Sequence, residues 1–103
     1  MNEINNFKEF KEFIKNDKSV IIFYTKWCPI CKMLIFTLEE YLEEHPELSI
    51  AKVCYSDAVD VVSEVNVKFA PTTLFYNRGN LVEKRQGMLE WEDLDAIFLS
   101  LIK

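Results

Sequence analysis

Glycine and proline are both scarce in this sequence of 103 residues, which contains two glycines and three prolines. A loop that cradles phosphate groups needs several glycines close together, so the sequence excludes such a loop and we expect no nucleotide cofactor. No stretch rich in Gly, Pro or Ser divides the chain, and no internal repeat is present. We therefore expect a single domain over residues 1–103.

Long apolar runs and an excess of basic charge are also missing. The longest uncharged apolar runs, residues 20–25 and 69–77, are far shorter than the ~20 residues that a transmembrane helix needs. With 12 Lys and Arg against 17 Asp and Glu, the formal net charge is −5, which would repel a nucleic-acid backbone. We expect neither a membrane-spanning segment nor a nucleic-acid partner.

Cysteine is present in a small, odd number, and the chain opens without an export signal. Three cysteines do not resemble the paired framework of a small secreted protein. The opening residues Met1-Asn2-Glu3-Ile4 lack the basic region and the apolar stretch of a signal peptide. Both observations favour a reducing compartment, and we expect the cytoplasm.

Half of the residues are hydrophobic, and their spacing predicts alternating helices and strands. Asn6 resembles the N-cap of a helix that carries phenylalanines at helical spacing, and Asp57 is expected to cap a short helix in the same way. The first helix is expected to end near Asn16. The pattern then predicts a buried strand over 19–25, an amphipathic helix over 31–44 and a strand over 48–55.

The second half of the chain has the pattern of an antiparallel pair followed by a helix. Strands are predicted over 72–76 and 80–85, joined by the tight-turn sequence Asn77-Arg78-Gly79-Asn80. Apolar residues at helical spacing over 94–102 predict a last amphipathic helix. The complete pattern predicts an α/β fold with a central mixed sheet flanked by helices on both faces.

The segment Trp27-Cys28-Pro29-Ile30-Cys31-Lys32 lies between a predicted strand and a predicted helix. A helix N-terminus carries unpaired N–H groups and partial positive charge, so a thiol there is favoured as thiolate, and Cys28 is the candidate nucleophile. Pro29 suits the first helical turn because it has no N–H to leave unpaired. Cys31, about one turn later, is the candidate resolving thiol. The segment predicts thiol–disulfide exchange.

Two other interpretations of the Cys-x-x-Cys spacing are a zinc site and a pair of inert core cysteines. Zinc needs two more ligands, for which His45 and Cys54 are the spare candidates, but the intervening helix would place His45 ~20 Å from the thiols. A helix start next to Trp27 and Pro29 favours the redox interpretation over an inert pair. Cys54 is expected to be an inert strand residue near the same end of the sheet.

Over nearly its whole length the chain resembles the thioredoxin family. The resemblance rests on Trp27 before the first cysteine, Lys32 after the second, Ala70-Pro71-Thr72, the Asn77-Arg78-Gly79 hairpin and Gln86-Gly87-Met88. It implies that Pro71 faces the dithiol and that the peptide bond before Pro71 is cis. A cis bond there would present the Ala70 backbone to an extended substrate segment. The substrate-binding residues expected on this basis are Trp27, Pro29, Ile30, Ala70, Pro71, Thr72, Gly87 and Met88. The implied activity is reduction of protein disulfides.

The chain departs from the family at two points of its chemistry. Proline stands first between the cysteines, as in glutaredoxins, and the buried acid of the preceding strand is replaced by Ile22, with its usual neighbour Lys52 expected to face solvent. The alternatives are a glutathione-linked thioltransferase and a non-catalytic binding module with the same fold. We expect a monomer without a bound cofactor, reduced by an external enzyme similar to thioredoxin reductase.

Overall fold

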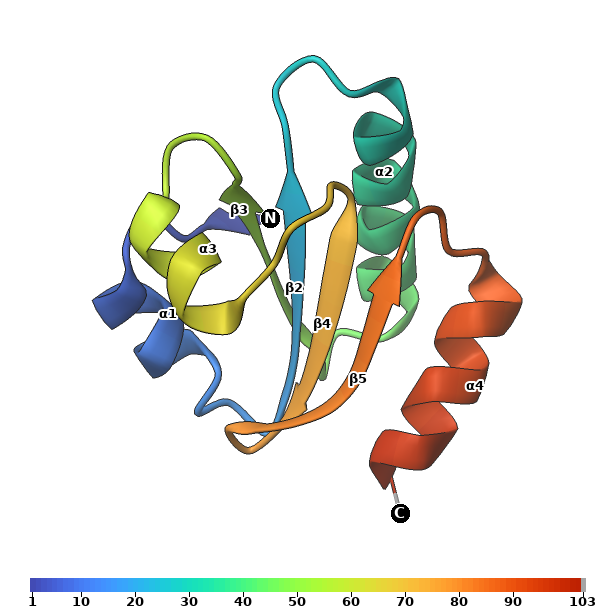
Figure 1. Ribbon diagram of the computed structural model, residues 1–103. Helices are drawn as coiled ribbons and strands as arrows, with labels where there is room; N and C mark the ends of the chain where they lie inside the picture. Colours follow the sequence, from blue (N-terminus) through green and yellow to red (C-terminus); the bar gives the residue numbers. More distant parts are fainter. Residues whose placement is uncertain (103) are drawn as a thin grey trace.

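The computed structural model describes the backbone of residues 1–102 and the side chains of residues 1–100. Strands and helices alternate along the chain as far as its fourth strand, which is followed directly by the fifth strand and then by the last helix (Figure 1). In order they are β1 (Asn2–Glu3), α1 (Phe7–Phe13), β2 (Lys18–Tyr24), α2 (Pro29–Glu44), β3 (Ser49–Cys54), α3 (Val59–Val65), β4 (Thr72–Asn77), β5 (Asn80–Gln86) and α4 (Trp91–Ile102). Within residues 1–102, none of the helices has the length and apolar character of a membrane-spanning segment.

The strands form one five-stranded sheet in the order β1-β3-β2-β4-β5. β3 pairs in parallel with both β1 and β2, whereas β4 runs antiparallel to β2 and to β5. Parallel strands need a crossover, and α2 supplies the one between β2 and β3. The predicted mixed sheet is confirmed.

Two apolar clusters cover the two faces of this sheet. One joins α2 and α4 to the face that carries Val20 and Ile22. The other joins α1 and α3 to the face that carries Ile21 and Phe23. All four of these β2 residues are fully buried, which explains the uninterrupted apolar run that the sequence shows there. Helices therefore flank both faces, as predicted.

Three separate segments meet at one edge of the sheet, at the top of Figure 1. β2 ends there at Tyr24, and the loop that follows leads into α2. β4 begins at the same edge because Thr72 lies opposite Phe23, and β5 ends there because Gln86 lies opposite Thr72. We call this the dithiol edge, after Cys28 at the end of the β2–α2 loop and Cys31 in the first turn of α2.

The hairpin between β4 and β5 forms where the sequence predicts it. Arg78 and Gly79 both have positive φ angles, 50° and 85°, as a tight two-residue hairpin turn requires. Glycine adopts that conformation without steric cost.

The predicted Asn6 cap is confirmed, because its side chain accepts a hydrogen bond from the Glu9 amide at 2.9 Å. The predicted end of α1 is three residues too late. The side chains of Asn16 and Ser19 both donate to the carbonyl of Phe13, which ends the helix at that residue.

Two further differences concern β1 and the start of α3. Asp57 does not cap α3, whose N-cap is Ala58, because the Asp57 carboxylate pairs with Lys26 at 3.1 Å instead. β1 has no counterpart in the predicted elements. Its two residues form a strand because they pair with Ala51 and Lys52 of β3. Short-range sequence patterns do not predict this pairing.

Candidate active site

The dithiol lies where the β2–α2 loop turns into the helix. Cys28 is the N-cap of α2, and its Sγ accepts a hydrogen bond from the backbone N–H of Cys31 at 3.1 Å. Pro29 occupies the first turn, where a missing N–H leaves no bond unmade. The helix therefore begins two residues earlier than its apolar stripe predicts, and its first turn contains both thiols.

The two thiols have different environments. Cys28 is partly exposed, whereas Cys31 is fully buried on the stripe of α2 that faces the sheet. The Cys31 thiol donates a hydrogen bond to the Cys28 sulfur, and this contact, together with backbone N–H donors of the first turn, lowers the pKa of Cys28 below its usual value. Both cysteines are free thiols in this structure.

Burial acts in the opposite direction on the second thiol. Loss of hydration is the largest cause, and the hydrogen bond that Cys31 donates to Cys28 is the next, so that the pKa of Cys31 is raised to about 11. The first thiol thus ionises more readily than an ordinary cysteine thiol, and the second keeps its proton at neutral pH. A dithiol of this kind can attack a disulfide with its first sulfur, while its second sulfur stays protonated until the mixed disulfide has formed.

The Ala70–Pro71 peptide bond is cis, as the resemblance implies. Pro71 is buried at the start of β4, and its carbonyl accepts a hydrogen bond from the Gly87 amide at 2.9 Å. Gly87 has a φ of 87°, which glycine tolerates and other residues rarely adopt. The Thr72 hydroxyl donates to the carbonyl of Phe69. These contacts join the segments around residues 70–72 and 87 at the dithiol edge.

Large apolar side chains are exposed around this edge. Trp27 is 90% exposed and Ile30 is 51% exposed, so neither belongs to the core. Phe69, which the sequence analysis missed, is also 51% exposed and directly precedes Ala70. Its place directly before the Ala-Pro pair was the sequence signal that could have predicted an exposed aromatic residue at the dithiol edge. Met88 is half-buried and packs against the cluster under α2 and α4.

The position of the family's buried acid is apolar, as the sequence predicts. Ile22 is fully buried in the cluster beneath α2. Lys52, its neighbour on β3, does not simply face solvent: its ammonium lies 3.9 Å from the Glu3 carboxylate and 5.5 Å from the centre of the Tyr24 ring. The expectation of a solvent-facing Lys52 is corrected by β1, which supplies Glu3.

The spare zinc candidates are held in other contacts. Cys54 is 2% exposed at the end of β3, with its Sγ 3.5 Å from the Ser56 hydroxyl, and His45 ends α2 at the opposite end of the helix from the dithiol. Within the part of the chain that the structure describes, no group of three or more His, Cys, Asp or Glu side chains is arranged to hold a metal ion.

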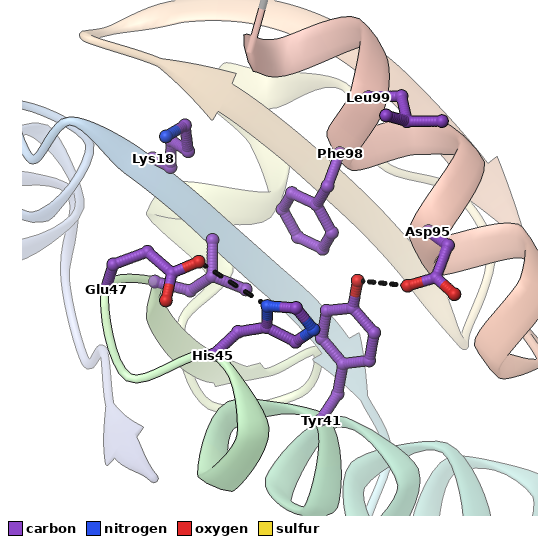
Figure 2. Close-up of a pocket in the computed structure, with 8 residues that line it drawn as sticks. Lys18, Tyr41, His45, Glu47, Asp95, Phe98 and Leu99 are labelled. Atoms are coloured by element: carbon purple, nitrogen blue, oxygen red, sulfur yellow. Dashed lines mark hydrogen bonds and ion pairs between the residues drawn. The ribbon is translucent and has the colours of Figure 1, made fainter.

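A cavity of about 240 Å³ lies near the C-terminal end of α2, away from the dithiol (Figure 2). The Tyr41 hydroxyl donates to Asp95 at 2.7 Å, and the His45 ring stacks on Tyr41 with 4.3 Å between ring centres. Tyr41 also stacks on Phe98 of α4. These contacts pack α4 against α2 and do not involve either thiol. The cavity is lined by Lys18, Tyr41, His45, Glu47, Leu48, Asp95, Phe98 and Leu99.

Comparison with known proteins agrees with the geometry. The family model for thioredoxin matches residues 2–100. A thioredoxin of Mycoplasmoides gallisepticum is 30% identical over 98 residues, covering 94% of this chain and 98% of that protein. The mitochondrial thioredoxin-3 of Saccharomyces cerevisiae is 34% identical over 86 residues, covering 82% of this chain and 68% of that protein.

Solved structures extend the agreement to the fold. The oxidised form of the mitochondrial thioredoxin 3 of Saccharomyces cerevisiae superposes with a TM-score of 0.82 at 29% identity, covering 99% of this chain and 93% of that one. A thioredoxin variant from Halobacterium salinarum shares the fold with a TM-score of 0.89 at 24% identity, covering 99% and 90% of the two chains. The chain therefore belongs to the thioredoxin family of thiol–disulfide oxidoreductases.

Proposed function

We propose that this protein reduces protein disulfides, with Cys28 as the nucleophile and Cys31 as the resolving thiol. The observation that carries the proposal is the unequal pair in the first turn of α2. The Cys28 sulfur accepts hydrogen bonds that stabilise its thiolate, while Cys31 is buried and keeps its proton.

The proposed reaction has two steps. The Cys28 thiolate attacks one sulfur of a substrate disulfide, forming a mixed disulfide and releasing the other substrate sulfur as a thiolate. Cys31 then loses its proton to solvent and attacks the Cys28 sulfur, which forms the Cys28–Cys31 bond and releases the second substrate sulfur as a thiolate; the substrate thiolates take up protons from solvent. The substrate gains two electrons and the protein dithiol loses two.

Substrate docking is proposed at the dithiol edge. The partly exposed Ala70 backbone lies beside the start of β4, where an extended segment could pair with it, and Trp27 and Ile30 offer exposed apolar surface next to Cys28. Backbone pairing tolerates many sequences, which suits a reductase of different protein disulfides. The full set proposed to contact substrate is Trp27, Pro29, Ile30, Ala70, Pro71, Thr72, Gly87 and Met88.

The test is reduction of insulin disulfides, followed by the turbidity of the precipitating chains. Cys28→Ser is expected to abolish turnover, and Cys31→Ser to accumulate a covalent adduct with substrate that mass spectrometry detects. Cys54→Ser is the matched control, because this third thiol is buried against Ser56, and it is expected to retain activity. Full activity in Cys28→Ser would contradict the proposal.

A glutathione-linked thioltransferase is the second candidate, favoured by the order Pro29-Ile30 between the cysteines. The exposed Trp27 and the cis Ala70–Pro71 bond favour the first candidate. Rapid reduction of the oxidised protein by glutathione, without response to a thioredoxin reductase, would reverse the order of the two. A protein without any measurable redox couple would instead be a binding module.

We further propose that the protein works as a monomer in the cytoplasm and binds no organic cofactor, its electrons coming from a thioredoxin reductase or a similar enzyme. Three free thiols suit a reducing compartment, although one of the relatives compared is mitochondrial. Reduction by NADPH through a purified thioredoxin reductase tests the electron source. Sedimentation tests the monomer, and cell fractionation tests the compartment.

A further inference from the structure

Phe69 is an exposed aromatic residue at an edge that also exposes Trp27 and Ile30. Of the eight phenylalanines in the chain, only Phe36 and Phe69 are exposed. Phe69 belongs to neither apolar cluster and makes no ring contact with another described aromatic residue. Large apolar side chains that gather on one exposed surface mark a site of interaction, so the Phe69 ring is available to a partner.

The register of the sheet places the start of β4 beside the dithiol. β2 and β4 run antiparallel, and their pairing at the dithiol edge ends with Phe23 opposite Thr72. Two residues after Phe23 comes Thr25, whose hydroxyl and backbone interact with the sulfurs of Cys28 and Cys31, respectively. Because adjacent strands are about 4.8 Å apart, the chain that leads into β4 runs next to the chain that leads to the thiols.

Phe69 lies in the chain that leads into β4, three residues before Thr72, and Figure 1 shows this chain reaching the upper end of β4. Its backbone is held in place, because the Thr72 hydroxyl donates to the Phe69 carbonyl and the Pro71 carbonyl accepts from the Gly87 amide. Ala70 lies between these two anchors, and neither its N–H nor its carbonyl is hydrogen-bonded to a described residue. A fixed backbone thus offers pairing groups at position 70 and an aromatic ring at position 69.

A substrate segment that pairs with this backbone brings one of its side chains onto Phe69. The substrate cysteine lies opposite Ala70, the position that offers pairing groups beside the thiols, and the residue next to that cysteine lies opposite Phe69. Directly opposed residues of paired strands have Cβ atoms about 4.5–5.5 Å apart, so their side chains touch. A large apolar side chain in that place removes its own surface and that of the ring from water, whereas a small polar one leaves the ring wet.

We propose that Phe69 selects protein disulfides in which a large apolar residue stands next to the cysteine that Cys28 attacks. This inference rests on the proposed function and adds a preference to it. Pairing with the Ala70 backbone accepts any substrate sequence, because it uses only N–H and carbonyl groups. The Phe69 ring distinguishes substrates by the size and polarity of one side chain. The chemical steps remain those of the proposed reaction.

Two disulfide-linked peptide dimers test this preference. They have the same length and the same charges, so the exposed Lys68 beside Phe69 treats them alike. They differ only in the two residues that flank the cysteine, which are leucine in one peptide and serine in the other. Reduced protein is mixed with each peptide, and acid-quenched samples are analysed by chromatography to obtain the rate of a single turnover. Wild-type protein is expected to react about tenfold faster with the leucine peptide.

Substitutions at Phe69 should change this preference without changing the chemistry. Phe69→Ser is expected to slow the reaction with the leucine peptide about tenfold and to leave the rate with the serine peptide unchanged. Phe69→Leu restores a large apolar side chain and is expected to recover most of the preference. Leu81→Ser is the matched control, because Leu81 is also 51% exposed but lies at the hairpin end of β5, and it is expected to behave as wild type.

Hydroxyethyl disulfide, a small reagent without a peptide backbone, separates this inference from the proposed function. Its rate of reduction is expected to be the same in wild type and Phe69→Ser. Wild-type protein that reduces neither this reagent nor insulin would contradict the proposed function itself.

Four results would overturn the role of Phe69 in a protein that is otherwise active. They are equal rates of wild type with the two peptides, an intact preference in Phe69→Ser, equal slowing of Phe69→Ser with both peptides, and loss of the preference in Leu81→Ser. Phe69 and Leu81 are both exposed, so these variants are expected to fold, and circular dichroism verifies it.

Discussion

Replacing Thr73 by valine is expected to stabilise the protein. Thr73 is fully buried in β4, opposite Ile22, and its hydroxyl makes no hydrogen bond to any described residue. Its side chain faces the apolar cluster under α2 and α4, to which Ile22 belongs. A buried polar group without a partner costs about 1–3 kcal/mol. Valine has nearly the same shape and suits a strand, so it removes that cost without opening a cavity.

The adjacent Thr72 provides a matched comparison with the opposite sign. It is equally buried, but its hydroxyl donates to the carbonyl of Phe69. Thr72→Val loses that bond and is expected to lower the free energy of unfolding by about 1 kcal/mol. Thr73→Val is expected to raise it by about 1–2 kcal/mol. The same chemical change at neighbouring positions should therefore differ by about 2–3 kcal/mol.

Urea unfolding of the reduced protein, followed by far-ultraviolet circular dichroism, measures both variants against wild type. The comparison is made on midpoints at an unchanged slope, so that a change in the unfolded state is recognised. If both variants lose stability by similar amounts, the Thr73 hydroxyl has a partner and the reasoning from its isolation is refuted.

Iodoacetamide alkylation of each cysteine in wild-type protein can be followed against pH by peptide mapping. Cys28 should show an apparent pKa below that of an ordinary thiol, and Cys31 should react only as the pH approaches about 11. Equal midpoints for the two cysteines would contradict the asymmetry. Tyr41→Phe loses the 2.7 Å bond to Asp95 and should cost about 1–2 kcal/mol in urea unfolding without changing insulin reduction. Ile22→Asp places a carboxylate at a fully buried position and should cost roughly 3–5 kcal/mol; a neutral result would mean that water reaches Ile22.

Much of the fold follows from patterns that act over one or two turns of chain. The Asn6 cap, the apolar stripe of α2 and the Gly79 turn each depend on residues a few positions apart, and each forms as predicted. The same locality explains the failure at Asp57. Its sequence context resembles a cap, but the ammonium of Lys26, thirty-one positions earlier, competes for the carboxylate.

By itself, the sequence determined the dithiol, its place at a helix N-terminus and the alternation of elements around it, because capping, helix periodicity and the Cys-x-x-Cys spacing are short-range properties. Only the tertiary structure decided that Asn2 and Glu3 form a strand, that Glu3 contacts Lys52 and Tyr24, and that the Thr73 hydroxyl has no hydrogen-bond partner among the residues the structure describes. The physical reason is that strand pairing across about fifty residues depends on how whole strands align. A two-residue strand has too few side chains for its sequence to predict which strand it pairs with.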